Sequence, residues 1–70
     1  MYIFKNELFD SIKEKYKIKS IAKTVGLTDG YLSQIFNGKK TCPKTTAYAI
    51  VKTLNENAEI EDYFNVNRGV

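Results

Sequence analysis

Hydrogen-bonding side chains gather along one side of the segment 29–36. Leu32, Ile35 and Phe36 recur there at spacings of three and one, which predicts a helix with those residues turned inward. The outward side would then carry Asp29, Gly30, Ser33, Gln34 and Asn37, and Tyr31 would lie at its edge. A glutamine amide can pair with adenine through two hydrogen bonds, a carboxylate can accept one from cytosine, and a hydroxyl suits a base or a phosphate. The pattern indicates contact with base edges in duplex DNA, and the candidate base-contacting residues are Asp29, Gly30, Tyr31, Ser33 and Gln34.

Catalytic chemistry has little support in this sequence. There is no histidine, and the single cysteine, Cys42, has no plausible base beside it in sequence. The acidic residues near 56–62 follow the pattern of a solvated helix face, whereas metal sites need clustered Cys, His or carboxylate ligands. The sequence therefore predicts no enzyme activity, no catalytic residues, no metal site and no cofactor.

A second short helix and a tight turn precede the segment 29–36. Four apolar residues at helical spacing mark one face of a helix over 18–25: Ile18, Ile21, Ala22 and Val25. Gly26 should end that helix, since the residue past a helix end often takes a left-handed backbone that glycine adopts without strain. The Thr28 hydroxyl can cap the next helix. Two short helices joined by a glycine-containing turn describe a helix-turn-helix.

The register of these residues resembles the lambda-repressor and Cro-type helix-turn-helix family of phage and bacterial regulators. The matching positions are Ala22, Gly26, Leu27, Leu32, Ile35 and the pair Asn37-Gly38. The resemblance extends from about 18 to 43, weakens toward 64 and is absent at both ends. It implies that the second helix of the motif enters the major groove of an operator duplex, and that the protein binds a roughly palindromic site as a homodimer, at least on DNA.

The expected fold is an all-α, five-helix, lambda-repressor-like DNA-binding domain. The predicted helices cover about 6–16, 18–25, 29–36, 44–55 and 60–64. Seventy residues allow one domain with a small core, which we assign to 1–64, followed by a flexible C-terminal tail over 65–70. In the resembling family the region of the last helix often supports dimerisation. The alternative role of its apolar residues is to complete the core.

Positive charge is concentrated in the first part of the chain. Residues 1–40 hold eight Lys and four acidic residues, whereas 41–70 hold three basic and four acidic residues. Lysines clustered on a helix-turn-helix form the footprint that phosphate contacts require. Where the family often carries a phosphate-contacting glutamine, this chain has Ile18, so that contact would pass to a neighbouring lysine or to backbone N–H groups. The candidate phosphate-contacting residues are Lys17, Lys19, Thr28, Asn37, Lys39, Lys40, Thr41 and Lys44.

The sequence departs from the family pattern at the start of the segment 29–36. Asp29 would be repelled by phosphate and can instead stabilise the helix N-terminus through the helix dipole. Gly30 offers no side chain and costs helix stability of about 1 kcal/mol against alanine. Tyr31 either contacts DNA or packs on the first helix. These departures support an alternative function, a protein-interaction module such as an antirepressor or antitoxin-like partner that binds and masks a repressor protein.

Composition limits the cellular setting. The apolar content of 43% with 27% charged residues is ordinary for a soluble globular protein. No apolar run approaches the length of a membrane span, so we expect no membrane partner. A single cysteine in a loop favours a reducing compartment, and the cytoplasm is the expected location.

Overall fold

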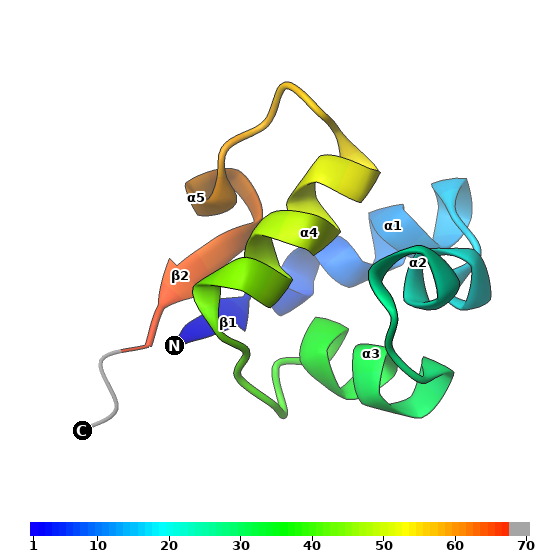
Figure 1. Cartoon of the computed structure of the whole chain (residues 1–70), viewed down its shortest axis with the longest axis horizontal. Helices are drawn as coiled ribbons and strands as arrows, with labels where there is room; N and C mark the ends of the chain where they lie inside the picture. Colours follow the sequence, from blue (N-terminus) through cyan, green and yellow to red (C-terminus); the bar gives the residue numbers. More distant parts are fainter. Residues whose placement is uncertain (68–70) are drawn as a thin grey trace.

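Five α-helices surround one core in the computed structural model, which describes residues 1–67 (Figure 1). The helices are α1 (Phe9–Lys15), α2 (Ile18–Val25), α3 (Asp29–Phe36), α4 (Lys44–Leu54) and α5 (Ile60–Tyr63). A 3-10 turn, η1 (Asn6–Leu8), leads directly into α1. The five predicted helices are therefore present, with small differences at their ends. None of the helices in 1–67 has the length and apolar character needed to cross a membrane.

The structure corrects the all-α prediction, because two short strands join the ends of the described chain. β1 (Tyr2–Phe4) pairs antiparallel with β2 (Phe64–Val66), with Ile3 opposite Asn65. The predicted last helix ends at Tyr63 rather than at 64, and Asn65 and Val66 form part of a strand instead of the expected flexible tail. Positions 68–70 of that predicted tail lie outside the described residues.

The first predicted helix, 6–16, is divided into two kinds of helical turn. The Leu8 N–H donates to the Lys5 carbonyl and the Phe9 N–H to the Asn6 carbonyl, which are the three-residue bonds of a 3-10 turn. The α-helical pattern begins only at Phe9, since β1 brings the chain in along a different direction. At the other end, the Tyr16 hydroxyl donates to the Leu54 carbonyl (2.7 Å), which ties the end of α1 to the end of α4.

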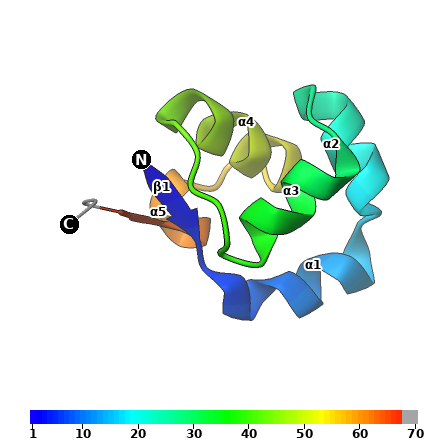
Figure 2. The ribbon, with the colours of Figure 1, turned by 90° about the horizontal axis from the view of Figure 1, so that it is seen from below.

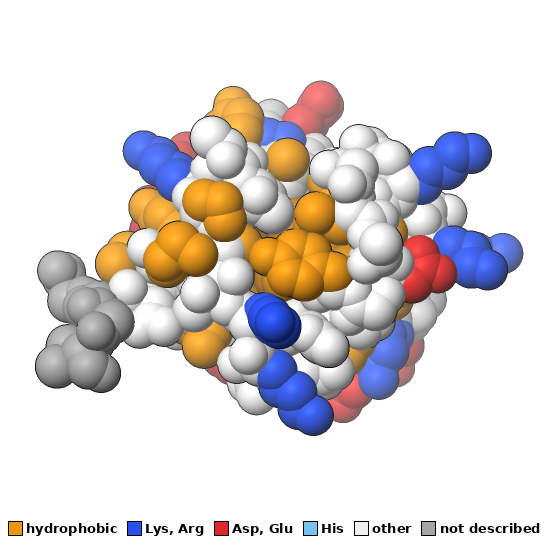
Figure 3. All heavy atoms as spheres, turned by 60° about the horizontal axis from the view of Figure 1, so that its bottom comes forward, with side chains coloured by type: hydrophobic (Ala, Val, Ile, Leu, Met, Phe, Trp, Pro, Cys, Tyr) orange, Lys and Arg blue, Asp and Glu red, His pale blue; other side chains and the backbone are white. Residues whose placement is uncertain are grey.

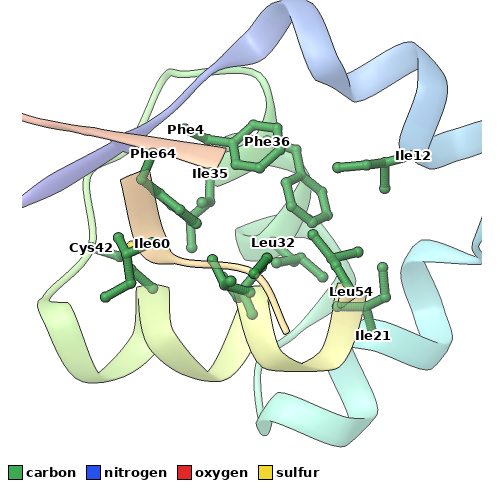
Figure 4. Close-up of a cluster of buried hydrophobic side chains, with 14 of the residues drawn as sticks. Phe4, Ile12, Ile21, Leu32, Ile35, Phe36, Cys42, Leu54, Ile60 and Phe64 are labelled. Carbon is green, nitrogen blue, oxygen red and sulfur yellow. The ribbon is translucent and has the colours of Figure 1, made fainter. Parts of the chain in front are cut away.

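Aromatic rings fill the centre of the core (Figure 4). The Phe4 ring meets the edges of Phe36 and Phe64 at centroid distances of 4.7 and 5.2 Å, and Phe9 lies 5.4 Å from Phe36. Phe36 is fully buried, as its spacing from Leu32 predicts. Because buried aromatics contribute large apolar area and specific edge packing, these contacts join the sheet to α1 and α3 and hold α3 at a fixed position.

Cys42 belongs to the core although it lies between two helices. Its side chain is fully buried, and burial raises the pKa of the Cys42 thiol to about 11. Backbone hydrogen bonds run in both directions between Tyr2 and Cys42, at 2.8 and 2.9 Å. The segment between α3 and α4 is therefore fastened to β1, on the side of β1 that does not pair with β2.

Candidate nucleic-acid interface

The turn between α2 and α3 is built by local backbone chemistry. Gly26 takes a left-handed conformation with φ of 78°, and the N–H groups of Gly26 and Leu27 both donate to the Ala22 carbonyl. These bonds satisfy the Ala22 carbonyl in the last turn of α2. Thr28 then caps α3, since its hydroxyl oxygen accepts from the Tyr31 N–H at 3.2 Å. The predicted helix-turn-helix is confirmed at the predicted boundaries.

Close packing in this motif depends on small and branched residues. Ala22 and Ile21 of α2 are buried, and Leu32 and Ile35 of α3 are fully buried. An alanine at the contact lets the two helix backbones approach each other, because it adds only a methyl group between them. In Figure 2, α3 lies in front, with α2 on one side and the segment that leads to α4 on the other.

The candidate base-contacting residues on α3 differ in their exposure to solvent. Asp29, Gly30 and Gln34 are exposed, whereas Ser33 and Tyr31 are half-buried. Tyr31 packs partly against the hydrophobic core, so the packing role weighed for it from the sequence is present, with part of its side chain still accessible. Gln34 is therefore the longest exposed side chain in this set that can both donate and accept hydrogen bonds.

Gly30 leaves open space on this exposed side. A Cβ atom added at Gly30 would meet no heavy atom within 4 Å, and its backbone is helical. Neither packing nor a special backbone conformation within the protein requires glycine here. Glycine costs about 1 kcal/mol of helix stability against alanine. A binding partner that approaches the α3 backbone closely would account for glycine at this position.

The end of α3 positions the lysines that follow it. The Gly38 and Lys39 N–H groups donate to the Ile35 and Gln34 carbonyls at 3.0 and 2.9 Å. Together with the left-handed Gly38 (φ 76°), these bonds form a Schellman motif, which terminates the helix and turns the chain. Lys39 and Lys40 then lie exposed between this motif and the Tyr2–Cys42 bridge.

The candidate phosphate-contacting residues lie on both sides of α3. Lys17 and Lys19 are at the start of α2, and Lys39, Lys40 and Lys44 follow α3; all five are exposed. Thr28 and Asn37 are exposed at the two ends of α3, while Thr41 is half-buried. Within residues 1–67 the one ion pair joins Lys13 to Asp10, so none of these five lysines is neutralised by a carboxylate.

The N-terminus of α2 is also open to an anion. Lys17 precedes the helix without a side-chain cap, and no acidic residue lies in the first turn. Uncapped N–H groups at a helix start, together with the positive end of the helix dipole, favour a phosphate. The lysines and this helix start thus provide positive charge to two sides of the exposed surface of α3, and both the lysines and these backbone N–H groups are candidates from the sequence.

The sequence did not indicate that β1 supports the candidate interface. The run Tyr2-Ile3-Phe4 is rich in strand-forming residues, but three residues are too few to show the alternation that predicts a strand. In the structure this strand holds the Cys42 backbone, and Asn6 lies under Gly38, 3.6 Å from where its Cβ would be. The N-terminal residues therefore support the lysine-bearing segment from beneath.

Comparison with known proteins agrees with this geometry. A family model described as helix-turn-helix matches residues 12–60, which is 49 of the 70 residues. The chain therefore belongs to the Cro- and repressor-type helix-turn-helix family, and it is a DNA-binding regulator. No curated protein and no solved structure gave a match.

Replacing both Lys39 and Lys40 by alanine should weaken binding to all duplexes alike. Each phosphate contact releases counterions, so losing both should flatten the dependence of log affinity on log salt by about 1–2 units. Affinity measured by fluorescence anisotropy over a salt series would give this slope. The double variant Lys13→Ala, Lys15→Ala on α1 removes the same charge elsewhere and serves as the control. An unchanged slope for the Lys39 and Lys40 variant would exclude these lysines from the interface.

Gly30→Ala should stabilise the protein and weaken its binding to DNA. Alanine at this helical position is worth about 1 kcal/mol in helix propensity, and the added methyl group meets no protein atom. Thermal unfolding would measure the stabilisation, and anisotropy would measure the affinity. Ser11→Ala, at an exposed position of α1, is the control for a propensity gain alone. Unaltered DNA affinity of Gly30→Ala would show that the duplex does not approach Gly30 closely.

Proposed function

We propose that this protein is a Cro- or repressor-like transcription factor of a phage or prophage. It binds a roughly palindromic operator as a homodimer, with α3 of each subunit in the major groove. Half-sites about 34 Å apart, one helical turn, fit this arrangement. The observation that carries the proposal is the exposed side of α3, which lies between two sets of lysines that make no ion pair within residues 1–67. Its place of action is the cytoplasm, where a bacterial operator lies.

The division of labour within the interface follows from side-chain chemistry. Gln34 contacts a base edge, for which its amide offers a donor and an acceptor together, the combination that pairs with adenine. Ser33 and Tyr31 serve as secondary contacts at the border of the buried side. Asp29 meets a cytosine or stabilises the start of α3. The lysines, with Thr28, Asn37 and Thr41, fix the position of the protein along the backbone and add no sequence information.

A second candidate function rests on the first turn of α3. Asp29 and Gly30 are both exposed there, and neither an acidic side chain nor a missing one favours contact with DNA. Such a surface also fits a protein that binds a basic reading helix and masks it, as an antirepressor or antitoxin-like partner would. In that case the affinity for DNA would be weak, non-specific and lost at moderate salt.

Selection from a random duplex library by the purified protein at moderate salt distinguishes the two functions. A transcription factor should enrich a motif with two-fold symmetry, whose half-site spacing reports the separation of the two α3 helices. An absence of enrichment, with only salt-sensitive binding to every duplex, would contradict the operator proposal and favour the protein-masking function. A duplex carrying one half-site, tested against the full motif, separates monomer from dimer binding.

Gln34→Ala should relax the preference at one base pair of each half-site. Losing a bidentate amide contact costs about 1–3 kcal/mol of discrimination against the wrong base. Binding to the selected operator and to single-base variants would show at which position the preference disappears. Asn57→Ala, which removes an exposed amide beyond the end of α4, is the matched control. Full retention of discrimination by Gln34→Ala would remove this residue from the base-contacting set.

A further inference from the structure

A hollow lies between α1, the end of α4 and α5, outside the candidate nucleic-acid interface. Its volume is about 190 Å³. Apolar side chains form much of its wall, with Leu8 and Ile12 on the side of α1 and Leu54 on the side of α4. The candidate base-contacting and phosphate-contacting residues all belong to the described chain, and none of them lines this hollow. DNA binding therefore does not account for it.

Backbone acceptors beside the hollow are already paired. The Tyr16 hydroxyl donates to the Leu54 carbonyl at 2.7 Å, and the Tyr16 N–H donates to the Ile12 carbonyl at 2.8 Å. Tyr16 thus joins α1 to α4 at the hollow and uses its own donors to do so. The protein itself meets the need for a donor at this place.

The polar groups that remain free at the hollow can all donate. Ser11, Lys15 and Tyr63 line it, and their side chains form no hydrogen bond or ion pair within residues 1–67. A hydroxyl can donate, and an ammonium group can only donate. Lys15 lies in the last turn of α1, which suits the helix dipole, and its exposed ammonium is still available to a ligand. These groups favour an occupant with acceptor oxygens.

The acidic residues of α5 do not oppose a negatively charged occupant, because their carboxylates are engaged elsewhere. The Asp62 carboxylate accepts from the Glu59 N–H at 2.9 Å, at the start of α5. Glu59 and Glu61 line a different hollow, on the other side of α5 from α1. Among the described residues that line the first hollow, Lys15 is the one with a charge. The charge of the site is therefore positive.

The size of the hollow limits the occupant to a single ring. A cavity of about 150 Å³ holds benzene, whereas pockets for drug-sized ligands measure about 300–1,000 Å³. The observed volume of about 190 Å³ lies just above the first value. Tyr63 provides a rigid aromatic wall, since its ring is held nearly parallel to that of Phe4, with 6.4 Å between the centroids.

We propose that this hollow binds a small carboxylate with one ring, of the size of benzoate. The ring lies against Leu8, Ile12 and Tyr63, and the carboxylate meets the ammonium of Lys15 at the open rim. Because the candidate DNA contacts lie elsewhere, the protein can hold this ligand and a duplex at the same time. The ligand binds the folded chain and so raises its unfolding temperature. The inference does not depend on the operator proposal.

Titration with benzoate near neutral pH, followed by the backbone amide signals of the labelled protein, tests the location. Shifts should concentrate in residues 8–16 and at Leu54 and Tyr63. An anion can also bind at the DNA interface. Figure 3, which brings the lower side of Figure 1 and its α3 forward, shows Lys and Arg side chains around that face. Shifts confined to residues 17–19 and 28–44 would overturn the proposal.

The role of the charge is tested by a pair of lysine variants. Lys15→Met keeps an apolar stem and should weaken benzoate binding by about three- to fivefold, the effect of an exposed charge pair. Lys13→Met is the matched control, because the Lys13 ammonium pairs with Asp10 and Lys13 does not line the hollow. Benzamide, a neutral molecule of the same shape, should bind the native protein more weakly than benzoate by a similar factor. Equal affinity for benzamide and benzoate, or full affinity of Lys15→Met, would contradict the assignment of a carboxylate.

Filling the hollow from its own wall gives an independent test. Ser11→Leu adds apolar volume at an exposed helical position and should abolish benzoate binding, while circular dichroism shows an intact fold. Undiminished binding by Ser11→Leu would exclude the hollow as the site. Benzoate should also bind the protein–duplex complex as tightly as the free protein, and displacement of benzoate by duplex would overturn the separation of the two sites. A failure to select an operator from a duplex library would leave all of these results unaffected.

Discussion

Burial of one side of α3 is the constraint on which the rest of this structure depends. Leu32, Ile35 and Phe36 are fully buried, and they leave the helix no freedom to rotate about its axis. Once they are buried, the 3.6-residue period decides which residues face solvent. The exposure of Gln34, Asp29 and Gly30 is thus a consequence of core packing. A large-to-small change at Phe36 would cost about 3–5 kcal/mol, a large part of the stability of a domain this small.

The ends of α3 are fixed as firmly as its rotation. Thr28 begins the helix with a side-chain hydrogen bond, and the Schellman motif at Gly38 ends it. The segment after it is tied by Cys42 to β1, whose Phe4 ring packs on Phe36. Helix α3 and the lysines beyond it are therefore positioned by one continuous set of contacts. This coupling matters for the proposed function, because phosphate contacts carry no sequence information themselves. They contribute to specificity only by fixing the position of α3 along the duplex.

Most of the helical structure follows from local rules, and those parts were predictable. The boundaries of α2 and α3 depend on neighbouring residues, Gly26 and Thr28, and they match the prediction. The strands do not follow such rules, because Tyr2–Phe4 pairs with a segment sixty residues away, and a three-residue strand has too few positions to show alternation. Asn6 and Tyr2 support the segment that carries Lys39 and Lys40, although they lie more than thirty residues before it in the sequence. The candidate residues could therefore be predicted from the sequence, but the contacts that hold them in position could not.

The weak reading chemistry of α3 has a consequence for how specificity can arise. A single good amide–adenine pair discriminates by about 1–3 kcal/mol per half-site, while Gly30 contributes no side chain and Asp29 is unfavourable near phosphate. A monomer with one such contact would be dominated by its lysines and would bind most duplexes similarly. Two half-sites read by a symmetric dimer add their discrimination, and the shape of the intervening base pairs can add more.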